Sequence, residues 1–238
     1  ILVMRAAPEC YGLAPDGMSP DEARAFAARM RLPSAASEVQ WTRPEAIRTR
    51  AIWLVMLAYG IAGIGYGAML LHLVPFMTDN GIPRTRATVL FSGFAWSALL
   101  VKFFWGWMMD RYHARYLSIL SFVISGVTMV GFLPAASTHN EWVMLAMLVA
   151  YGTGVGGIVP LQETVWASYF GRQHLGSIRA VAMPFSIFFG AFGPLLAGTL
   201  YDWAGNYILA FSAFAAFQLF GIVLVVLARP PRHPSAVG

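Results

Sequence analysis

Long apolar segments alternate with short polar connections over most of this 238-residue chain. Each segment is close to the roughly 20 residues that a helix needs to cross a bilayer. None shows the alternation of apolar and polar residues that is typical of a membrane β-strand, and backbone groups in lipid must be paired within the segment. The pattern therefore predicts an all-α polytopic membrane protein with six spanning helices. We place them at about 51–77, 87–109, 117–136, 142–165, 178–200 and 207–227.

The first fifty residues are more polar and are interrupted by prolines. One short helix is expected after Ser19, because Ser19 and Glu22 form a capping box. Residues 1–4 resemble the end of a further apolar segment, so we expect this chain to be the later part of a longer polypeptide.

Composition supports a membrane protein. Apolar residues make up 58% of the chain and charged residues 11%, whereas soluble domains are about 25% charged. The single cysteine, Cys10, excludes an internal disulfide bond. The net charge of +5 comes from arginines in short loops, which is not the pattern of a nucleic-acid-binding surface.

These arginines predict the orientation of the chain. Cytoplasmic loops carry an excess of Lys and Arg, and Arg84 and Arg86 are the two arginines expected on the opposite side. Both ends of the six-helix region are therefore predicted to be cytoplasmic. The nine arginines that flank the apolar segments on the predicted cytoplasmic side are Arg43, Arg48, Arg50, Arg111, Arg115, Arg172, Arg179, Arg229 and Arg232.

Lys102 is the only lysine and lies inside the second apolar segment. It is eight residues from Asp110, or about 12 Å along a helix. A cation at this depth is costly unless it faces water, a partner or a substrate, which favours the binding of an anion. Snorkelling of the side chain to the interface and a structural ion pair are the alternatives.

Three other residues are candidates for lining a cavity. His72 could bind substrate or a proton, but we favour a structural hydrogen bond for it. Tyr66 and Tyr151 could line the cavity or bond between helices. Glycines and prolines gather in segments one, four and five, where close packing and bending are equally good explanations. No metal-binding or nucleophile motif is present, so neither a cofactor nor an enzyme is expected.

The stretch from Gly106 to Arg115 resembles the motif of the major facilitator superfamily, at Gly106, Asp110, Arg111 and Arg115. It departs from the usual pattern at His113 and Ala114. Residues 5–17, 72–82 and 169–179 resemble the monocarboxylate porter and oxalate/formate antiporter branch. The resemblance implies that 1–50 is the end of helix six and a cytoplasmic central loop, 51–228 is helices seven to twelve, and 229–238 is a cytoplasmic tail. An N-terminal six-helix half would complete the fold.

The resemblance also implies roles for individual residues. In that branch, a cation four positions before the motif glycine binds the substrate carboxylate, and Lys102 occupies this position. The aspartate that monocarboxylate porters use for proton coupling corresponds to Ala98 here. Glu163 is expected to pair with Arg111, Arg115 or Arg172, and Asp110 to face the start of segment five, as a latch between two states. Interfacial charges without a gating role are the alternative.

The leading hypothesis is a secondary active transporter of a small organic anion, a mono- or dicarboxylate, that works by alternating access. Protons are a candidate coupling ion, and a bacterial-type inner membrane or a plasma membrane is the expected location. The alternative with the same fold is a proton-driven exporter of apolar or drug-like compounds. A membrane-embedded enzyme has no supporting motif, and a receptor or scaffold is the remaining class.

Overall fold

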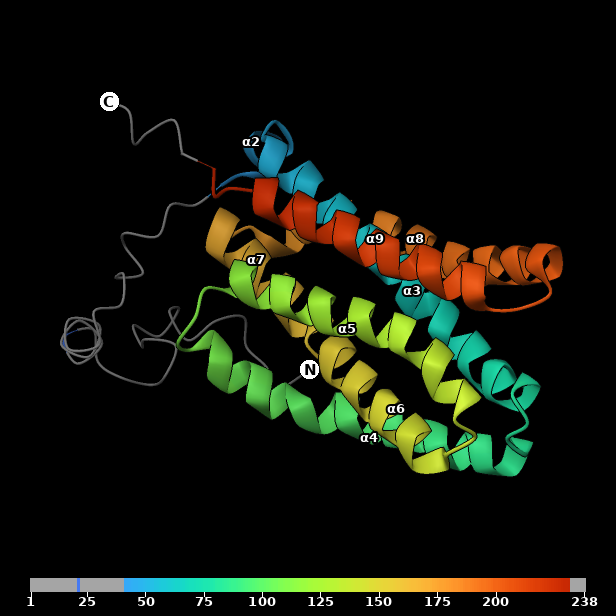
Figure 1. The fold of residues 1–238 in the computed structure, drawn as a ribbon. Coiled ribbons are helices and arrows are strands. Elements are labelled where there is room, and N and C mark those ends of the chain that lie inside the picture. Colours follow the sequence, from blue (N-terminus) through green and yellow to red (C-terminus); the bar gives the residue numbers. More distant parts are fainter. Residues whose placement is uncertain (1–20, 22–40, 232–238) are drawn as a thin grey trace, which may run out of the picture. The chain divides into compact units, whose positions relative to one another are not determined.

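The computed structural model describes Asp21 and residues 41–231 (Figure 1). The helix expected after Ser19 and the stretch at 5–17 lie outside the described residues. Within residues 41–231 the chain is all-α, without a strand. Its helices are α2 (Arg43–Ile47), α3 (Arg50–Asp79), α4 (Arg84–Met109), α5 (Ala114–Ser137), α6 (Glu141–Gly156), α7 (Ile158–Phe170), α8 (Leu175–Ala204) and α9 (Ile208–Leu227).

Six candidate membrane spans occur in this described part, with α6 and α7 together forming one of them. The predicted all-α architecture with six spanning helices is confirmed for the described residues. Several helices begin before the apolar pattern does, because polar residues cap them. The Thr49 hydroxyl accepts the Ile52 N–H at 3.4 Å, and the Asn140 side chain accepts the Trp142 N–H at 2.9 Å.

The fourth segment, predicted as one helix over 142–165, is broken at Gly157. In a continuous helix the Gly157 N–H would bond to the Thr153 carbonyl. Here the indole N–H of Trp105 on α4 takes that carbonyl at 2.9 Å, and the Gly157 N–H bonds to Gly154 at 3.3 Å instead. Pro160 also lacks the N–H that would pair with the Gly156 carbonyl. The tertiary contact and the proline together produce the break.

Glycines allow two helix pairs to pack with their backbones in close contact. On the α3–α8 pair, a Cβ added at Gly67 would lie 2.1 Å from the Gly190 carbonyl oxygen, and one at Gly193 would lie 2.0 Å from that of Ile64. On the α4–α6 pair, a Cβ at Gly152 would lie 2.6 Å from the Phe94 carbonyl oxygen. These distances show the close packing that small residues permit. A bending role for these segments stays a prediction.

Burial differs among the spans. In the most apolar window of α4 and of α8, 17% of residues are buried, against 44–56% in the other spans. Large apolar side chains are exposed along both helices, among them Phe103 and Trp96 on α4 and Phe188 and Leu195 on α8. The core consequently lies among α3, α5, α6 and α9.

Candidate functional site

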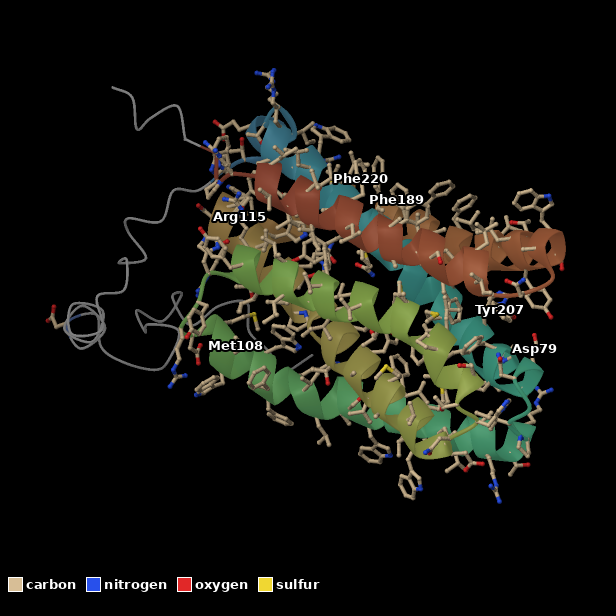
Figure 2. The ribbon with its side chains drawn as sticks, in the orientation of Figure 1. Asp79, Met108, Arg115, Phe189, Tyr207 and Phe220 are labelled. Atoms are coloured by element: carbon tan, nitrogen blue, oxygen red, sulfur yellow. The ribbon has the colours of Figure 1, made fainter. Side chains whose placement is uncertain are left out.

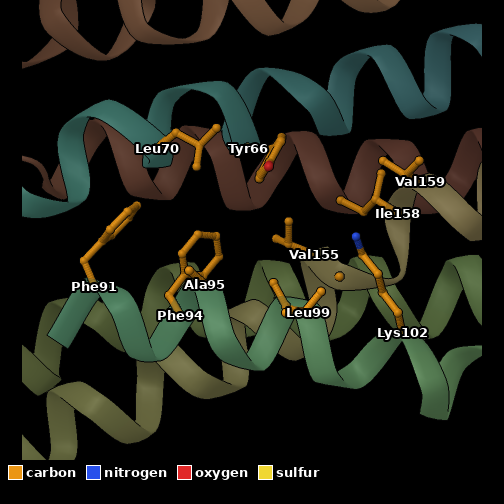
Figure 3. Close-up of a pocket in the computed structure, with 12 residues that line it drawn as sticks. Tyr66, Leu70, Phe91, Phe94, Ala95, Leu99, Lys102, Val155, Ile158 and Val159 are labelled. Atoms are coloured by element: carbon orange, nitrogen blue, oxygen red, sulfur yellow. The ribbon is translucent and has the colours of Figure 1, made fainter. Parts of the chain in front are cut away.

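A cavity of about 330 Å³ lies between α3, α4 and the α6–α7 break (Figure 3). Its walls are apolar except for Lys102 and the hydroxyl of Tyr66. The lining residues are Tyr66, Leu70, Phe91, Phe94, Ala95, Ala98, Leu99, Lys102, Val155, Gly156, Ile158 and Val159.

One face of α4 forms the longest wall of the cavity. Phe91, Phe94 or Ala95, Ala98 and Lys102 recur at the three- and four-residue intervals that place side chains on one side of a helix. Lys102 is thus at one end of this wall and Phe91 at the other, about 16 Å away along the helix. This spacing is visible in the sequence, but only the packing of α4 beside α3 and α7 shows that this face of the helix borders a cavity.

Lys102 reaches the cavity without a protein partner. Its side chain is exposed and makes no hydrogen bond or ion pair with any residue in the described part of the chain. Figure 3 shows its amino group directed toward Tyr66 and Ile158 on the opposite wall. The structural ion pair considered from the sequence is therefore not formed within 41–231.

The break at Gly157 shapes the wall opposite Lys102. Val155 and Gly156 end α6, and Ile158 and Val159 begin α7, and all four line the cavity. The first turn of a helix has N–H groups without intrahelical acceptors and carries a partial positive charge. The last turn of α6, which carries the opposite partial charge, ends at the same wall, so the charge at this cavity is that of Lys102.

His72 does not line the cavity. Its Nε2 lies 3.1 Å from the Pro194 carbonyl on α8, and its Nδ1 lies 3.1 Å from the Tyr207 hydroxyl. Because a carbonyl only accepts, Nε2 carries the proton and Nδ1 accepts from Tyr207. Burial, with Asp79 and Tyr201 nearby, raises the pKa of Tyr207 to about 12, so its hydroxyl remains a donor. His72 has the structural hydrogen bonds that we favoured for it.

Tyr151 also lies outside the cavity lining. It is fully buried and its ring stacks on Phe94 at 5.5 Å, while its hydroxyl has no hydrogen-bond partner among the described residues. The ring supports Phe94 from behind. Of the four predicted substrate-binding residues, the structure brings Lys102 and Tyr66 together at the cavity and leaves His72 and Tyr151 elsewhere.

The predicted gating residues lie at one end of the bundle, which we call the motif end. Figure 2 shows Met108 and Arg115 there, and Asp79 and Tyr207 at the opposite end. Arg115 caps α9, since its guanidinium donates to the carbonyls of Val225, at 3.1 Å, and Val226.

The rest of the motif makes fewer contacts within this chain. Arg111 stacks over the Trp107 ring at 4.1 Å. The side chain of Asp110 is exposed and has no partner among the described residues, so the expected contact with the start of α8 is not made here. A Cβ added at Gly106 would meet no described atom within 4 Å.

Glu163 pairs with a residue that the sequence analysis did not choose for it. Its carboxylate lies 3.1 Å from Arg179 of α8, while Arg111 and Arg115 make the contacts given above. Arg172 is exposed in the turn between α7 and α8. The predicted partners of Glu163 were chosen because their loops are near it in the sequence. In the structure α7 lies beside the first turn of α8, which brings Arg179 to Glu163.

No group of three or more His, Cys, Asp or Glu side chains in the described residues could hold a metal ion. The arrangement instead offers one cation and one hydroxyl around an apolar space. Such a site can hold an anion that carries apolar groups.

Comparison with known proteins gives a consistent result. Residues 55–238 match the family model described as Major Facilitator Superfamily. Monocarboxylate transporter 11 of Homo sapiens is 26% identical over 192 residues, which cover 78% of this chain and 41% of that protein. Monocarboxylate transporter 13 of Rattus norvegicus is 30% identical over 175 residues, covering 72% of this chain and 40% of that protein.

A bacterial relative is named for a different anion. The nitrite extrusion protein of Bacillus subtilis (strain 168) is 25% identical over 181 residues, covering 75% of this chain and 45% of that protein. The chain spans less than half the length of each of these three relatives.

Proposed function

Because this chain belongs to the Major Facilitator Superfamily, we propose that the complete protein is a secondary active transporter of a small organic anion, a mono- or dicarboxylate, that works by alternating access. The observation that carries this proposal is Lys102, which lies on a candidate membrane-spanning helix and reaches the cavity without a partner among residues 41–231. A cation without a protein partner inside a membrane-spanning segment is stabilised by an anion that it binds. The relatives named for monocarboxylates and for nitrite also concern small anions.

Each group at the cavity has a role in this proposal. Lys102 neutralises the carboxylate as a compact charge with three donors. Tyr66 donates its hydroxyl to a second carboxylate oxygen. Protons are the coupling ion that we consider first.

The test is uptake of labelled carboxylates by the complete protein in liposomes, for the wild type and for Lys102→Gln. We expect saturable uptake that falls at least tenfold in Lys102→Gln, because the anion loses its counter-charge in a low-dielectric site. Lys102→Arg should retain part of the activity. Arg84→Gln is the matched control, since it removes one positive charge from the exposed start of the same helix.

An exporter of apolar or drug-like compounds remains the second candidate, because most of the cavity wall is apolar. This candidate predicts that efflux of an apolar compound is unchanged in Lys102→Gln and that carboxylates do not compete with it. That result, obtained with an active protein, would replace the anion proposal.

The membrane arrangement is part of the proposal. Residues 1–50 form the end of helix six and a central loop, residues 51–228 form helices seven to twelve, and 229–238 form a tail. The motif end faces the cytoplasm of a bacterial-type inner membrane or a plasma membrane, in keeping with the excess of arginines there. A second six-helix half completes the transport path. Gly106, Asp110, Arg111, Arg115, Glu163 and Arg172 act in gating at this end.

A further inference from the structure

The two ends of the cavity along α4 differ in chemical character. Its one charge, Lys102, is at one end, while Phe94 and Phe91 lie eight and eleven positions away, about 12 and 16 Å along the helix. Between these two ends the cavity is lined by the small side chains of Ala95 and Ala98, which we call the floor of the cavity. Figure 3 shows Phe91 and Leu70 facing each other at the end of the cavity away from Lys102.

The aromatic end is held in place by ring contacts. Phe94 stacks on the buried Tyr151 with ring centroids 5.5 Å apart, and Phe91 lies 5.3 Å from Phe94. Phe94 itself is 4% exposed, so its ring cannot turn away without disturbing the core. This end is therefore a firm apolar surface.

We propose that the cavity selects a monocarboxylate with an extended apolar or aromatic body, which places its carboxylate at Lys102 and its body over Ala98 and Ala95 against Phe94. This inference rests on the proposed function and narrows its substrate class. A volume of about 330 Å³ is within the range of cavities that hold drug-sized ligands, and is far larger than nitrite or formate needs.

The same lining disfavours two other classes of anion. The second charge of a dicarboxylate would lie among apolar side chains, where Tyr66 is the one lining side chain besides Lys102 that can donate, and an unpaired charge in apolar surroundings is costly. An α-amino acid would bring an ammonium group, and the lining residues include no Asp or Glu to receive it.

The experiment measures competition for uptake by the complete protein in liposomes. The labelled probe is 3-phenylpropionate, and the competitors are acetate, hexanoate, 3-phenylpropionate, succinate and nitrite. Each methylene group moved out of water favours binding roughly fourfold. We therefore expect 3-phenylpropionate and hexanoate to compete at least about tenfold more strongly than acetate, succinate or nitrite.

A cavity-filling variant gives an independent test. Ala95→Phe places a ring on the floor and should lower the ratio of 3-phenylpropionate to acetate uptake about tenfold. Ala146→Phe introduces the same ring at an exposed position of α6 outside the cavity and should leave the ratio unchanged. The competition series on the wild type remains informative if Ala95→Phe does not fold.

The outcomes separate the two proposals. Lys102-dependent uptake in which acetate, succinate or nitrite competes as strongly as 3-phenylpropionate would overturn the apolar-body inference and leave the anion transporter intact. If the ratio of 3-phenylpropionate to acetate uptake is the same in a folded, active Ala95→Phe protein as in the wild type, the apolar-body inference is also overturned. If no carboxylate is taken up in a Lys102-dependent manner, the proposed function itself fails.

Discussion

The α3–α8 and α4–α6 pairs use the same packing device with different results. In both, glycines bring the backbones so close that a Cβ would overlap the partner helix. Yet α3 and α8 are continuous over 30 residues each, with Pro75 inside α3 and Pro184 and Pro194 inside α8. The helix opposite α4 is broken. Glycine content alone therefore does not break a helix in this protein.

In both pairs a side chain bonds to a backbone carbonyl of the partner helix, and the difference lies in what the backbone does at that carbonyl. Trp105 inserts an indole N–H at the Thr153 carbonyl and so competes with the helix for its own acceptor. On α3, the comparable side chain is His72, whose Nε2 bonds to the Pro194 carbonyl of α8, and α8 remains helical through this position. The cavity forms beside the pair in which a side chain displaces a backbone bond.

The largest effect should come from overfilling the α3–α8 contact. Gly67→Val would push side-chain atoms into the Gly190 backbone, which cannot move as a flexible side chain can. We expect the free energy of unfolding to fall by roughly 3 kcal/mol, measured as thermal unfolding of the complete protein in detergent. The control is Gly63→Val, since a Cβ there meets nothing within 4 Å. Equal losses in both variants would mean that helix propensity, not contact, governs this pair.

Trp105→Phe, at the α4–α6 pair, should have the next largest effect. It keeps a ring in the notch at Gly157 but removes the donor to Thr153. We expect a loss of about 1 kcal/mol of stability and a larger proportional loss of anion uptake, because the wall opposite Lys102 is then free to straighten. Trp96→Phe, at an exposed position of α4, is the control. Unchanged uptake in a folded Trp105→Phe protein would contradict a role of the indole in shaping the site.

The ion pairs at the two ends of the bundle should differ in function more than in stability. Glu163–Arg179 joins α7 to α8 at 3.1 Å, and Arg86–Glu141 joins α4 to α6 at 2.7 Å, both with partly exposed side chains. Double-mutant cycles with Gln should give coupling energies below about 1 kcal/mol for each. A gating role predicts that Glu163→Gln alters the uptake rate at least about threefold while Glu141→Gln does not. Similar rates for both variants would make Glu163 an interfacial charge only.

The smallest effect concerns the start of α5, outside both pairs. His113 Nδ1 accepts the Arg115 N–H at 3.2 Å, and burial, together with the nearby Arg115 charge, lowers the pKa of His113. The folded protein thus favours the neutral ring, so stability should be full at pH 7 and decrease as the pH falls below about 6.5. We expect a loss of a few tenths of a kcal/mol by pH 5, seen in the unfolding temperature. In His113→Asn, which caps without titrating in this range, that part of the pH dependence should disappear.

Much of the fold was predictable because the bilayer imposes a simple rule on the chain. Every backbone group in lipid must be paired within a helix, so apolar length determines the spans almost directly. The deviations are of two kinds. Polar caps such as Thr49 and Asn140 extend helices beyond the apolar pattern. The break at Gly157 escapes the pattern because Pro160 acts there together with Trp105, which is 52 residues away from Gly157 in the sequence.

The candidate site was predicted in part for the same reason. Lys102 could be chosen from the sequence, since a lone cation in an apolar segment demands a partner wherever the helices lie. Tyr66 was one of several plausible tyrosines, and Tyr151 was chosen with equal reason but is buried behind Phe94. Likewise, Glu163 clearly needed a cation, but the sequence offered four nearby arginines, and the structure pairs it with Arg179.

The sequence by itself thus determined the all-α membrane architecture, the six spans, the motif and the one intramembrane cation, because these depend on composition and local periodicity. The tertiary structure decided which side chains share a space with Lys102, where the fourth span breaks, and which partners His72, Arg115 and Glu163 take. Those outcomes depend on the rotation and offset of packed helices. Such quantities are set by contacts between residues far apart in the chain, and no local pattern encodes them.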